Sequence, residues 1–315
     1  MKLQLRQLAR PLSLTLLAAL AFAWSSGSVQ AQESDEDKEK LPPPVEVTLT
    51  TRDKVEIRCT YFGGTHKKDS VPVILLHQSG GNRHDWDDLA VYLQKTYGFA
   101  VIAPDLRGHG NSTNFNGQKV LAANMPLSQY PLMVTNDMEA VNQYLIERNN
   151  NGELNINKLS VVGAEMGAVV GMLWTLLDWS QPVLTTGKQG QDVKAVFMIS
   201  PPFVFKNLSM QELTQPGPAQ SAVRKQVSIY LAVGKSDPKA LRNANRIYNL
   251  FEPAHKAAMG DPQTRDLFYE QLDTRLQGMK LIEEKSLKLG EHVGDFIDVR
   301  AAGQSYPWVV RKSPI

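Results

Sequence analysis

The sequence has almost no cysteine: Cys59 is the only one in 315 residues. A single cysteine excludes an intramolecular disulfide. Cys59 lies in an alternating apolar segment, residues 55–62, and this position predicts a buried thiol rather than a reactive one.

The sequence also lacks a large excess of charge of either sign. Its formal net charge is +2, and residues 1–31 hold three basic residues and no acidic one. Loss of this segment would therefore leave a net charge of −1. Such a balance gives no reason to expect nucleic acid or an anionic membrane as a partner. The length suits one large α/β domain or two small ones.

The first segment contains no apolar run long enough to cross a bilayer. Its apolar stretch, residues 12–24, has about 13 residues, whereas a membrane span needs about 20. It follows Lys2, Arg6 and Arg10 and precedes a small-x-small sequence at residues 29–31. We therefore predict a secretory signal peptide over residues 1–31 rather than a membrane anchor. The mature protein is then exported, to a periplasm, the cell envelope or the medium, with no stable membrane span.

The remaining chain divides into three parts. Residues 32–44 are charged and proline-rich and form a linker, residues 45–300 form one domain, and residues 301–315 lack periodicity and are predicted to be a tail. Strands are predicted at residues 45–50, 55–62, 71–76, 99–103, 159–163, 193–199, 227–233 and 266–272, and helices at 86–97, 131–148, 166–179, 239–258 and 279–300, the last as one or two helices. This alternation predicts a mostly parallel sheet covered on both faces. Residues 203–226 are loop-like and are the place for a short lid.

The strand that ends at residue 163 passes within fewer than four residues into a helix. Gly163 and Gly167 flank Glu165 symmetrically, which is the frame of a nucleophile elbow, G-x-S-x-G, with glutamate at the central position. The glycines are expected because a Cβ at either position would clash where strand and helix pack. The central residue is expected to have a strained backbone.

With these residues in view, the chain resembles the α/β-hydrolase fold in its compact, bacterial esterase/lipase-like form, over roughly residues 45–300. The resemblance implies an eight-stranded, mostly parallel sheet with helices on both faces. The motifs that carry it are H-Q-S-G-G at 77–81, D-L-R-G-H-G-N-S at 105–112, G-A-E-M-G at 163–167 and G-K-S-D at 234–237. In this family serine attacks a carbonyl, histidine accepts its proton and an acid orients the histidine.

Carried over to this chain, the resemblance implies an oxyanion hole made by the backbone N–H groups of Gln78 and Met166, with Asp237 as the acid. Asp237 also precedes Pro238, which predicts a helix N-cap, and the two roles are compatible. Glu165 stands where the family has serine. The histidine position has two candidates. Either His292 is the base, or the loop after the last strand carries Gln277 in the histidine's place.

We favour Gln277, because its loop directly follows a predicted strand and leaves residues 279–300 free to close the fold. Under this interpretation His292 is an ordinary histidine on a helix surface. His77 and His109 are assigned to structural turns. Asp105 and Arg107 are expected to hold their own turn through ion pairs and hydrogen bonds.

Glutamate at the elbow permits three interpretations. In the first, the domain is catalytically silent and the Glu165 carboxylate accepts the oxyanion-hole N–H groups. In the second, Glu165 is a carboxylate nucleophile. In the third, Glu165 is a general base for water, with its pKa raised by the nearby charge of Asp237, or Ser79 is the nucleophile.

The sequence thus predicts an exported hydrolase-fold protein without the catalytic serine and histidine. We expect it to bind a small-molecule ligand or a protein partner, and the alternative is an active hydrolase of esters or similar small substrates. We predict no cofactor and no metal. The sequence does not indicate the oligomeric state.

Overall fold

The computed structural model describes residues 41–311, except residues 183, 185–186 and 256–263. The predicted signal peptide and residues 32–40 of the predicted linker lie outside the described residues. Residues 41–44 have no regular structure and lead into the first strand. Within the described residues, no helix is both long and apolar enough to cross a membrane.

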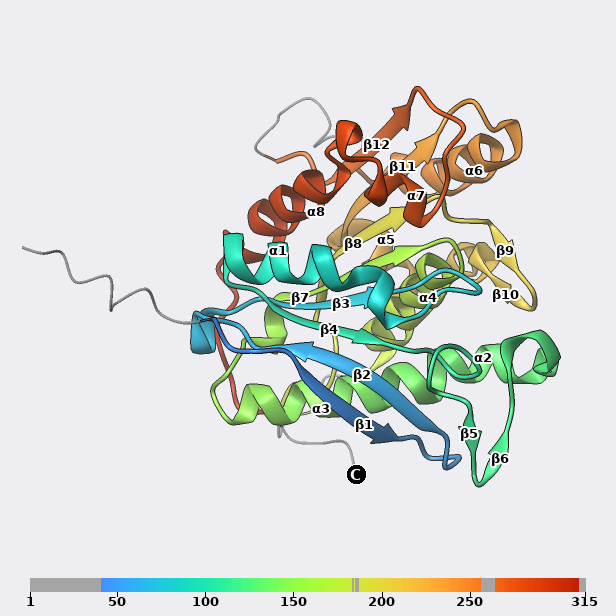
Figure 1. Ribbon diagram of the computed structural model, residues 1–315. Coiled ribbons are helices and arrows are strands. Elements are labelled where there is room, and N and C mark those ends of the chain that lie inside the picture. The colour runs from blue at the N-terminus through green and yellow to red at the C-terminus, as the bar shows by residue number, and fades with distance from the viewer. Residues whose placement is uncertain (1–40, 183, 185–186, 256–263, 312–315) are drawn as a thin grey trace, which may run out of the picture. The chain divides into compact units, whose positions relative to one another are not determined.

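An eight-stranded sheet forms the centre of the domain, in the order β1-β2-β4-β3-β7-β8-β11-β12 (Figure 1). The strands are β1 (Val45–Thr50), β2 (Glu56–Phe62), β3 (Pro72–Leu76), β4 (Ala100–Pro104), β7 (Leu159–Ala164), β8 (Val193–Ile199), β11 (Ser228–Gly234) and β12 (Leu267–Leu272). β2 runs antiparallel to β1 and to β4, and the remaining neighbours are parallel. All eight predicted strands are confirmed to within two residues at either end.

Helices cover both faces of the sheet, so the central strands β3 and β4 are apolar at every position. In β3, Val73 and Leu75 belong to the core beneath α1 (Asp87–Tyr97) and α8 (Leu289–Ile297). Ile74 and Leu76 alternate with them and belong to the core on the opposite face. That second core is completed by α3 (Met138–Asn150), α4 (Met166–Ser180), α5 (Pro218–Gln226) and α6 (Pro238–His255). Cys59 is fully buried there, as predicted.

One predicted helix is broken into shorter pieces, and another, predicted as one or two helices, forms two. The segment predicted as 131–148 is α2 (Tyr130–Leu132), a π-helical turn (Met133–Asp137) and α3. The segment predicted as 279–300 is α7 (Met279–Glu283), then α8 and a π-helical turn (Asp298–Ala302), with the break at residues 284–288. The predicted helix 239–258 is described as far as His255.

The predicted lid segment has more structure than its loop-like composition indicates. It forms a hairpin of β9 (Val204–Phe205) and β10 (Leu208–Ser209), a 3-10 helix (Met210–Thr214) and α5. Pro218, taken as a loop marker, is the first residue of α5, where a proline has no N–H to lose. A second hairpin, β5 (Asn114–Phe115) with β6 (Gln118–Lys119), follows the turn after β4.

The predicted C-terminal tail has no regular structure after Gly303, but it is fixed to the domain. Arg311 makes two hydrogen bonds with the buried carboxylate of Asp192, at 2.6 and 2.7 Å. The indole of Trp308 donates to the carbonyl of Asn149, whose side chain donates to the carbonyl of Val309. The lack of periodicity therefore does not mean that the segment is loose.

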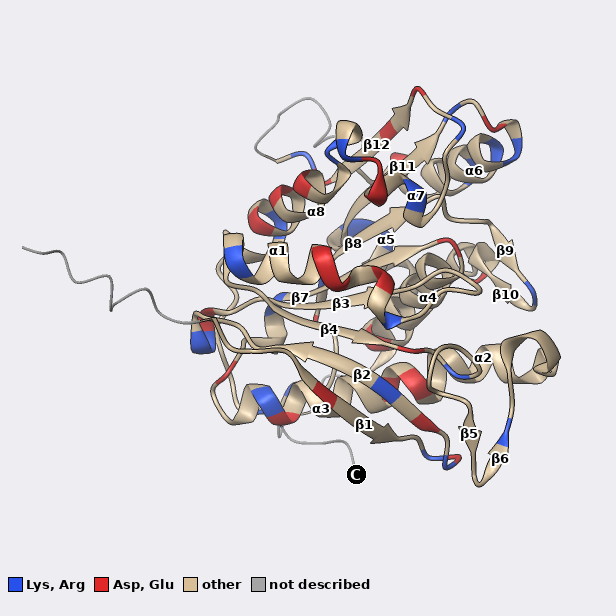
Figure 2. Cartoon of the chain, in the orientation of Figure 1, with Lys and Arg blue, Asp and Glu red and all other residues tan. Residues whose placement is uncertain are grey.

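Lys and Arg residues are interspersed with Asp and Glu residues along the helices and loops (Figure 2). This distribution matches the balanced charge of the sequence.

Candidate functional site

The candidate site lies where the parallel strands end. Gln78, Glu165, Ser200, Asp237 and Gln277 each follow the carboxyl end of a strand, namely β3, β7, β8, β11 and β12. In sheets of this kind ligands bind outside the carboxyl ends of the strands.

Glu165 forms the whole connection between β7 and α4. Its backbone has φ 44° and ψ −107°, a conformation that L-residues rarely adopt. Its N–H donates to the carbonyl of Ile199 at 2.8 Å and so ties the turn to the end of β8. A Cβ on Gly163 would meet the backbone of the first turn of α4, and a Cβ on Gly167 would meet the backbone of Leu76. The predicted reason for both glycines, close packing of strand and helix, is confirmed.

The carboxyl group of Glu165 has no partner. Among the described residues it forms no hydrogen bond and no ion pair. Its side chain is half-buried, and this burial raises its pKa above the ordinary value. No neighbouring charge contributes to the shift. The expectation that Asp237 raises the pKa of Glu165 is therefore wrong, and desolvation is the cause.

The Asp237 carboxylate forms no hydrogen bond with Glu165 or Gln277 and instead caps a helix. Its Oδ1 accepts the backbone N–H groups of Lys239 and Ala240, at 2.8 and 2.9 Å, which confirms the predicted N-cap of α6. These two hydrogen bonds, that of Ala240 first, lower the pKa of the exposed carboxyl.

Gln277 lies in the loop after β12 and connects three strand ends. Its Nε2 donates to the carbonyl of Gly234 at 2.7 Å, and its Oε1 accepts the hydroxyl of Ser200 at 2.6 Å. The next residue, Gly278, has φ 58°, and a Cβ there would lie 3.0 Å from Oε1 of Glu165. The loop of Gln277 is therefore packed against the Glu165 carboxyl group.

His292 is not part of this corner. It lies on α8, with its side chain 37% exposed, and its Nδ1 is 3.1 Å from Oε2 of Glu270 on β12. No contact joins it to Glu165 or to Asp237. The structure thus places Gln277, and not His292, beside the strand-to-helix turn.

The backbone N–H groups of Gln78 and Met166 donate to no partner among the described residues. The carboxylate of Glu165, expected to accept them, does not do so. The Gln78 side chain instead accepts the N–H of Met279 at 3.0 Å and so holds the loop after Gln277.

His77 is a structural residue. Its Nε2 lies 3.0 Å from the N–H of Leu106, which can only donate, so the proton is on Nδ1 and is donated to the carbonyl of Gln78 at 2.8 Å. Burial lowers the pKa of His77 to about 4, so the ring is neutral. Burial also lowers the pKa of His109, whose Nδ1 lies 3.1 Å from the carbonyl of Arg107.

Asp105 and Arg107 hold their turn through partners that are distant in sequence. Arg107 donates from Nε and Nη2 to Oδ1 of Asp137, at 2.8 and 2.7 Å, and from Nη1 to Asp53 at 2.7 Å. Asp105 pairs with Arg83 at 2.5 Å. The predicted structural role fits these contacts, but the sequence did not identify the partners.

Sequence reasoning also missed Ser200. This residue has φ 50°, and its hydroxyl donates to Gln277 and accepts the N–H of Gly278 at 3.0 Å. The available signal was its place at the end of β8, directly before two prolines. Among the described residues, no group of three or more His, Cys, Asp or Glu side chains is arranged to hold a metal ion.

This strand order, with helices on both faces and a strand–turn–helix at residues 159–180, defines the α/β-hydrolase fold. The family model described as alpha/beta hydrolase fold matches residues 71–220. No curated protein matches the chain.

Solved structures share the fold at low sequence identity. The esterase Pf2001 of Pyrococcus furiosus is 17% identical, with a TM-score of 0.54 over 82% of this chain and 93% of its own. A dienelactone hydrolase from Anabaena variabilis is 13% identical, with a TM-score of 0.56 over 83% of this chain and all (100%) of its own. A putative alpha/beta hydrolase from Agrobacterium tumefaciens is 17% identical, with a TM-score of 0.54 over 84% of this chain and 100% of its own.

Proposed function

We propose that the protein is an exported α/β-hydrolase-fold protein that has lost the catalytic serine and histidine of its relatives and binds a small ligand or a protein partner without turnover. One observation carries the proposal. Glu165 occupies the single-residue connection between β7 and α4, and Gln277 occupies the corner after β12.

The chemistry of these two side chains supports a silent site. A serine hydrolase needs an alcohol that attacks and a base that takes its proton. Glu165 has no alcohol, and the amide of Gln277 is not a base at neutral pH. Gln277 is also engaged at both ends, by Gly234 and Ser200, so its position is occupied by a supporting side chain.

The acid of the triad is missing from this corner as well. Asp237 comes from the expected strand end, but its carboxylate accepts two N–H groups of α6. The side chain that contacts Gln277 at its Oε1 is Ser200. A histidine at position 277 would therefore find a hydroxyl beside it and would lack a carboxylate to orient it.

The alternative is an active hydrolase of esters or similar small substrates. The unpartnered carboxyl group of Glu165 favours it, because a carboxyl whose pKa is raised by burial suits general-base work on water. The unbound N–H groups of Gln78 and Met166 would be suitable donors to a developing oxyanion. A nucleophilic Glu165 is less well supported, because no histidine lies beside it to activate the water that would cleave the ester intermediate.

Ester hydrolysis by residues 32–315, on p-nitrophenyl esters of short and medium acyl chains, tests the two functions. We expect no turnover above the background rate. Turnover that disappears in Glu165→Gln would contradict the proposal and make Glu165 a working base or nucleophile.

Reconstruction of the triad provides the matched positive control. Glu165→Ser with Gln277→His restores a nucleophile and a base. Addition of Ser200→Asp supplies the orienting carboxylate that Asp237 does not provide. We expect activity to increase from the double to the triple variant, because the acid holds the imidazole in the productive tautomer. If the native protein hydrolysed the esters faster than both variants, the proposal that the triad has been lost would be contradicted.

Export rests on the N-terminal segment, with its basic start, apolar run and small-x-small sequence at residues 29–31. Expression of the full chain in a bacterium and N-terminal sequencing of the product tests it. We expect a chain that begins at Gln32 and is found outside the cytoplasm. An uncleaved chain in the cytoplasm would contradict export.

A further inference from the structure

We propose that a groove along the outer face of α4 is a second binding site, separate from Glu165, for a small amphiphile with an apolar body and a cationic head. The groove has a volume of about 900 Å³. This volume is within the range of cavities that enclose small molecules. Glu165, Gln78 and Gln277 do not line it, so the inference goes beyond the function proposed for the strand ends.

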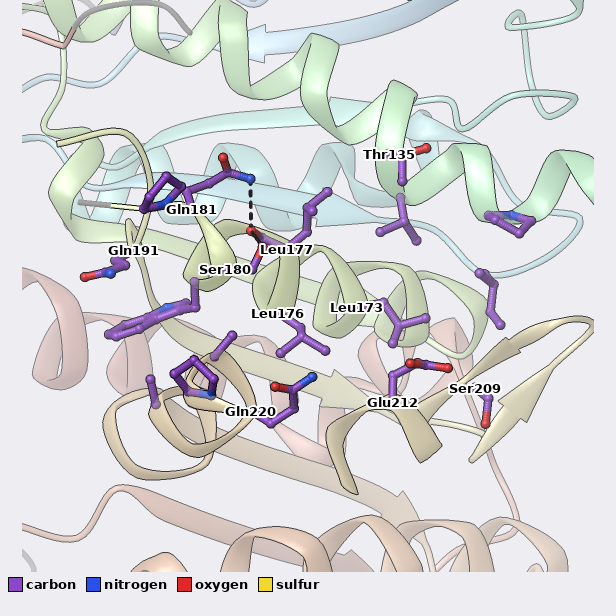
Figure 3. A pocket seen from close by; sticks show the side chains of 18 of the residues that line it. Thr135, Leu173, Leu176, Leu177, Ser180, Gln181, Gln191, Ser209, Glu212 and Gln220 are labelled. Carbon is purple, nitrogen blue, oxygen red and sulfur yellow. Dashed lines mark hydrogen bonds between the residues drawn. The ribbon is translucent and has the colours of Figure 1, made fainter. Parts of the chain in front are cut away.

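The floor of the groove is apolar and belongs to one helix. Leu173, Leu176 and Leu177 of α4 line it (Figure 3). Trp179, further along the same helix, also lines it. The lining continues to Gln181, so the floor from Leu173 onward extends for about 12 Å at the rise of an α-helix. A stripe of this length suits an elongated alkyl or aryl body.

The walls come from segments on either side of α4. Pro131 and Val134 line one side, before α3, and Pro218, Ala219 and Ala222 of α5 line the other. These side chains are small or apolar and would contact a ligand without offering it a charge. Most of the ligand's affinity would therefore come from burial of its apolar surface.

The charge of the groove lining indicates the charge expected of the ligand's head group. Of the described residues that line it, Glu212 is the only one with a charge. Figure 3 shows its side chain lying between its own segment and α4. Its carboxylate has no hydrogen-bond or ion-pair partner among the described residues, so a ligand cation would be its first.

The opposite end of the groove, at Trp179, is a less favourable place for a cation than the end at Glu212. The ring of Trp179 lies there, and the ammonium group of Lys194 is already 5.0 Å from the ring centroid. An incoming cation would meet this like charge, whereas at Glu212 it would meet an unpaired anion. The geometry therefore orients the ligand with its cationic head at Glu212 and its apolar body along α4.

Calorimetric titration of residues 32–315 with decyltrimethylammonium and decyl sulfate, both below their micelle-forming concentrations, tests the site. We expect saturable binding of the cation at one site and binding of the anion at least about threefold weaker, as for one exposed charge pair. Glu212→Gln should remove this preference and leave the fold unchanged, because the side chain is exposed.

A groove-filling variant tests the location. Ala219→Trp should abolish binding of the cation, and Val91→Trp is the matched control, since Val91 is exposed on α1 at the opposite face of the sheet. Equal affinity for anion and cation, an unchanged preference in Glu212→Gln, or full binding by a folded Ala219→Trp would each overturn the proposal. None of these variants alters the strand ends, so the result is independent of ester hydrolysis.

Discussion

Two motifs of this chain match the same fold family, but they differ in how their side chains are held. In the arginine turn, residues 105–112, the guanidinium of Arg107 is fully buried and bound by Asp137 and Asp53. In the elbow corner, formed by Glu165, Gln277 and the loop that follows, the carboxyl group of Glu165 has no hydrogen-bond or ion-pair partner among the residues that the structure describes.

This difference shows on which side chains the fold depends. Exchange of Arg107 would leave two carboxylates without their cation, one of them fully buried, so the fold itself requires the arginine. The elbow is shaped by Gly163 and Gly167 and by the N–H of Glu165, and not by the Glu165 side chain. A different side chain at position 165 can therefore be accommodated without loss of the fold.

The largest effect is expected in the arginine turn. Asp137→Ala removes the fully buried partner of Arg107 and leaves a buried cation with only the partly exposed Asp53. We expect a loss of about 3–5 kcal/mol in the free energy of unfolding, measured by urea denaturation. Asp53→Asn is the control and should cost less, because its carboxylate is partly solvated. If both variants lost the same free energy of unfolding, the greater burial of Asp137 would not determine the cost of losing its carboxylate.

The second effect is a pH dependence of the stability. It is caused by His77, whose ring accepts a hydrogen bond from the N–H of Leu106 in the arginine turn. The folded-state pKa of His77 is about 4, below its ordinary 6.5, so the unfolded chain binds more protons between these values. Stability contributed by neutral His77 is therefore present above pH 6.5 and is lost as the pH falls toward 4.

We expect this loss to reach about 3 kcal/mol for the full shift. Urea denaturation at a series of pH values measures it, and His77→Gln should reduce the slope between pH 6.5 and 4. An unchanged slope in the variant would assign the pH dependence to other groups, such as His109.

The sequence predicted most of the fold because the signals that specify it are local. Residues 71–76 form a continuous apolar run and residues 193–199 are apolar apart from Lys194, and both segments are central strands buried on both faces. The structure of residues 203–226 escaped prediction because Pro218 is equally compatible with a loop and with the first turn of a helix.

The site was harder to predict because its contacts join distant residues. Gln277 could be placed beside Glu165 from its position after a strand. The partners of Arg107 lie 30 and 54 residues away in sequence, and Ser200 lies 77 residues from Gln277. The local sequence pattern does not indicate which Asp residues pair with Arg107 or which Ser residue pairs with Gln277. These pairings could be identified only from the structure.

The third effect lies within the elbow corner and concerns the amide of Gln277. Gln277→Ala removes the amide that binds the Gly234 carbonyl and the Ser200 hydroxyl. We expect a loss of about 1–2 kcal/mol in the free energy of unfolding, because partly buried groups lose their hydrogen bonds. Thermal and urea denaturation measure it, with Gln118→Ala, at an exposed position of β6, as the control. A loss no greater than that of the control would show that Gln277 does not support the corner.

The smallest effect, and the one that bears most directly on the comparison, is that of Glu165→Gln. Burial raises the folded-state pKa of Glu165, so the folded protein binds more protons than the unfolded chain at pH values above 4.5. The carboxyl group therefore reduces the free energy of unfolding least at low pH, and stability falls as the pH rises through the raised pKa.

Glutamine at position 165 carries no charge, so the variant should be more stable than the native protein at pH 7. The gain should be no more than about 1 kcal/mol, because solvent screens the half-buried group. The difference should vanish below pH 4.5. Urea denaturation of both proteins at pH 4 and pH 7 tests this. A variant that is less stable at pH 7 would mean that the carboxylate holds the turn, and the contrast between the elbow corner and the arginine turn would be lost.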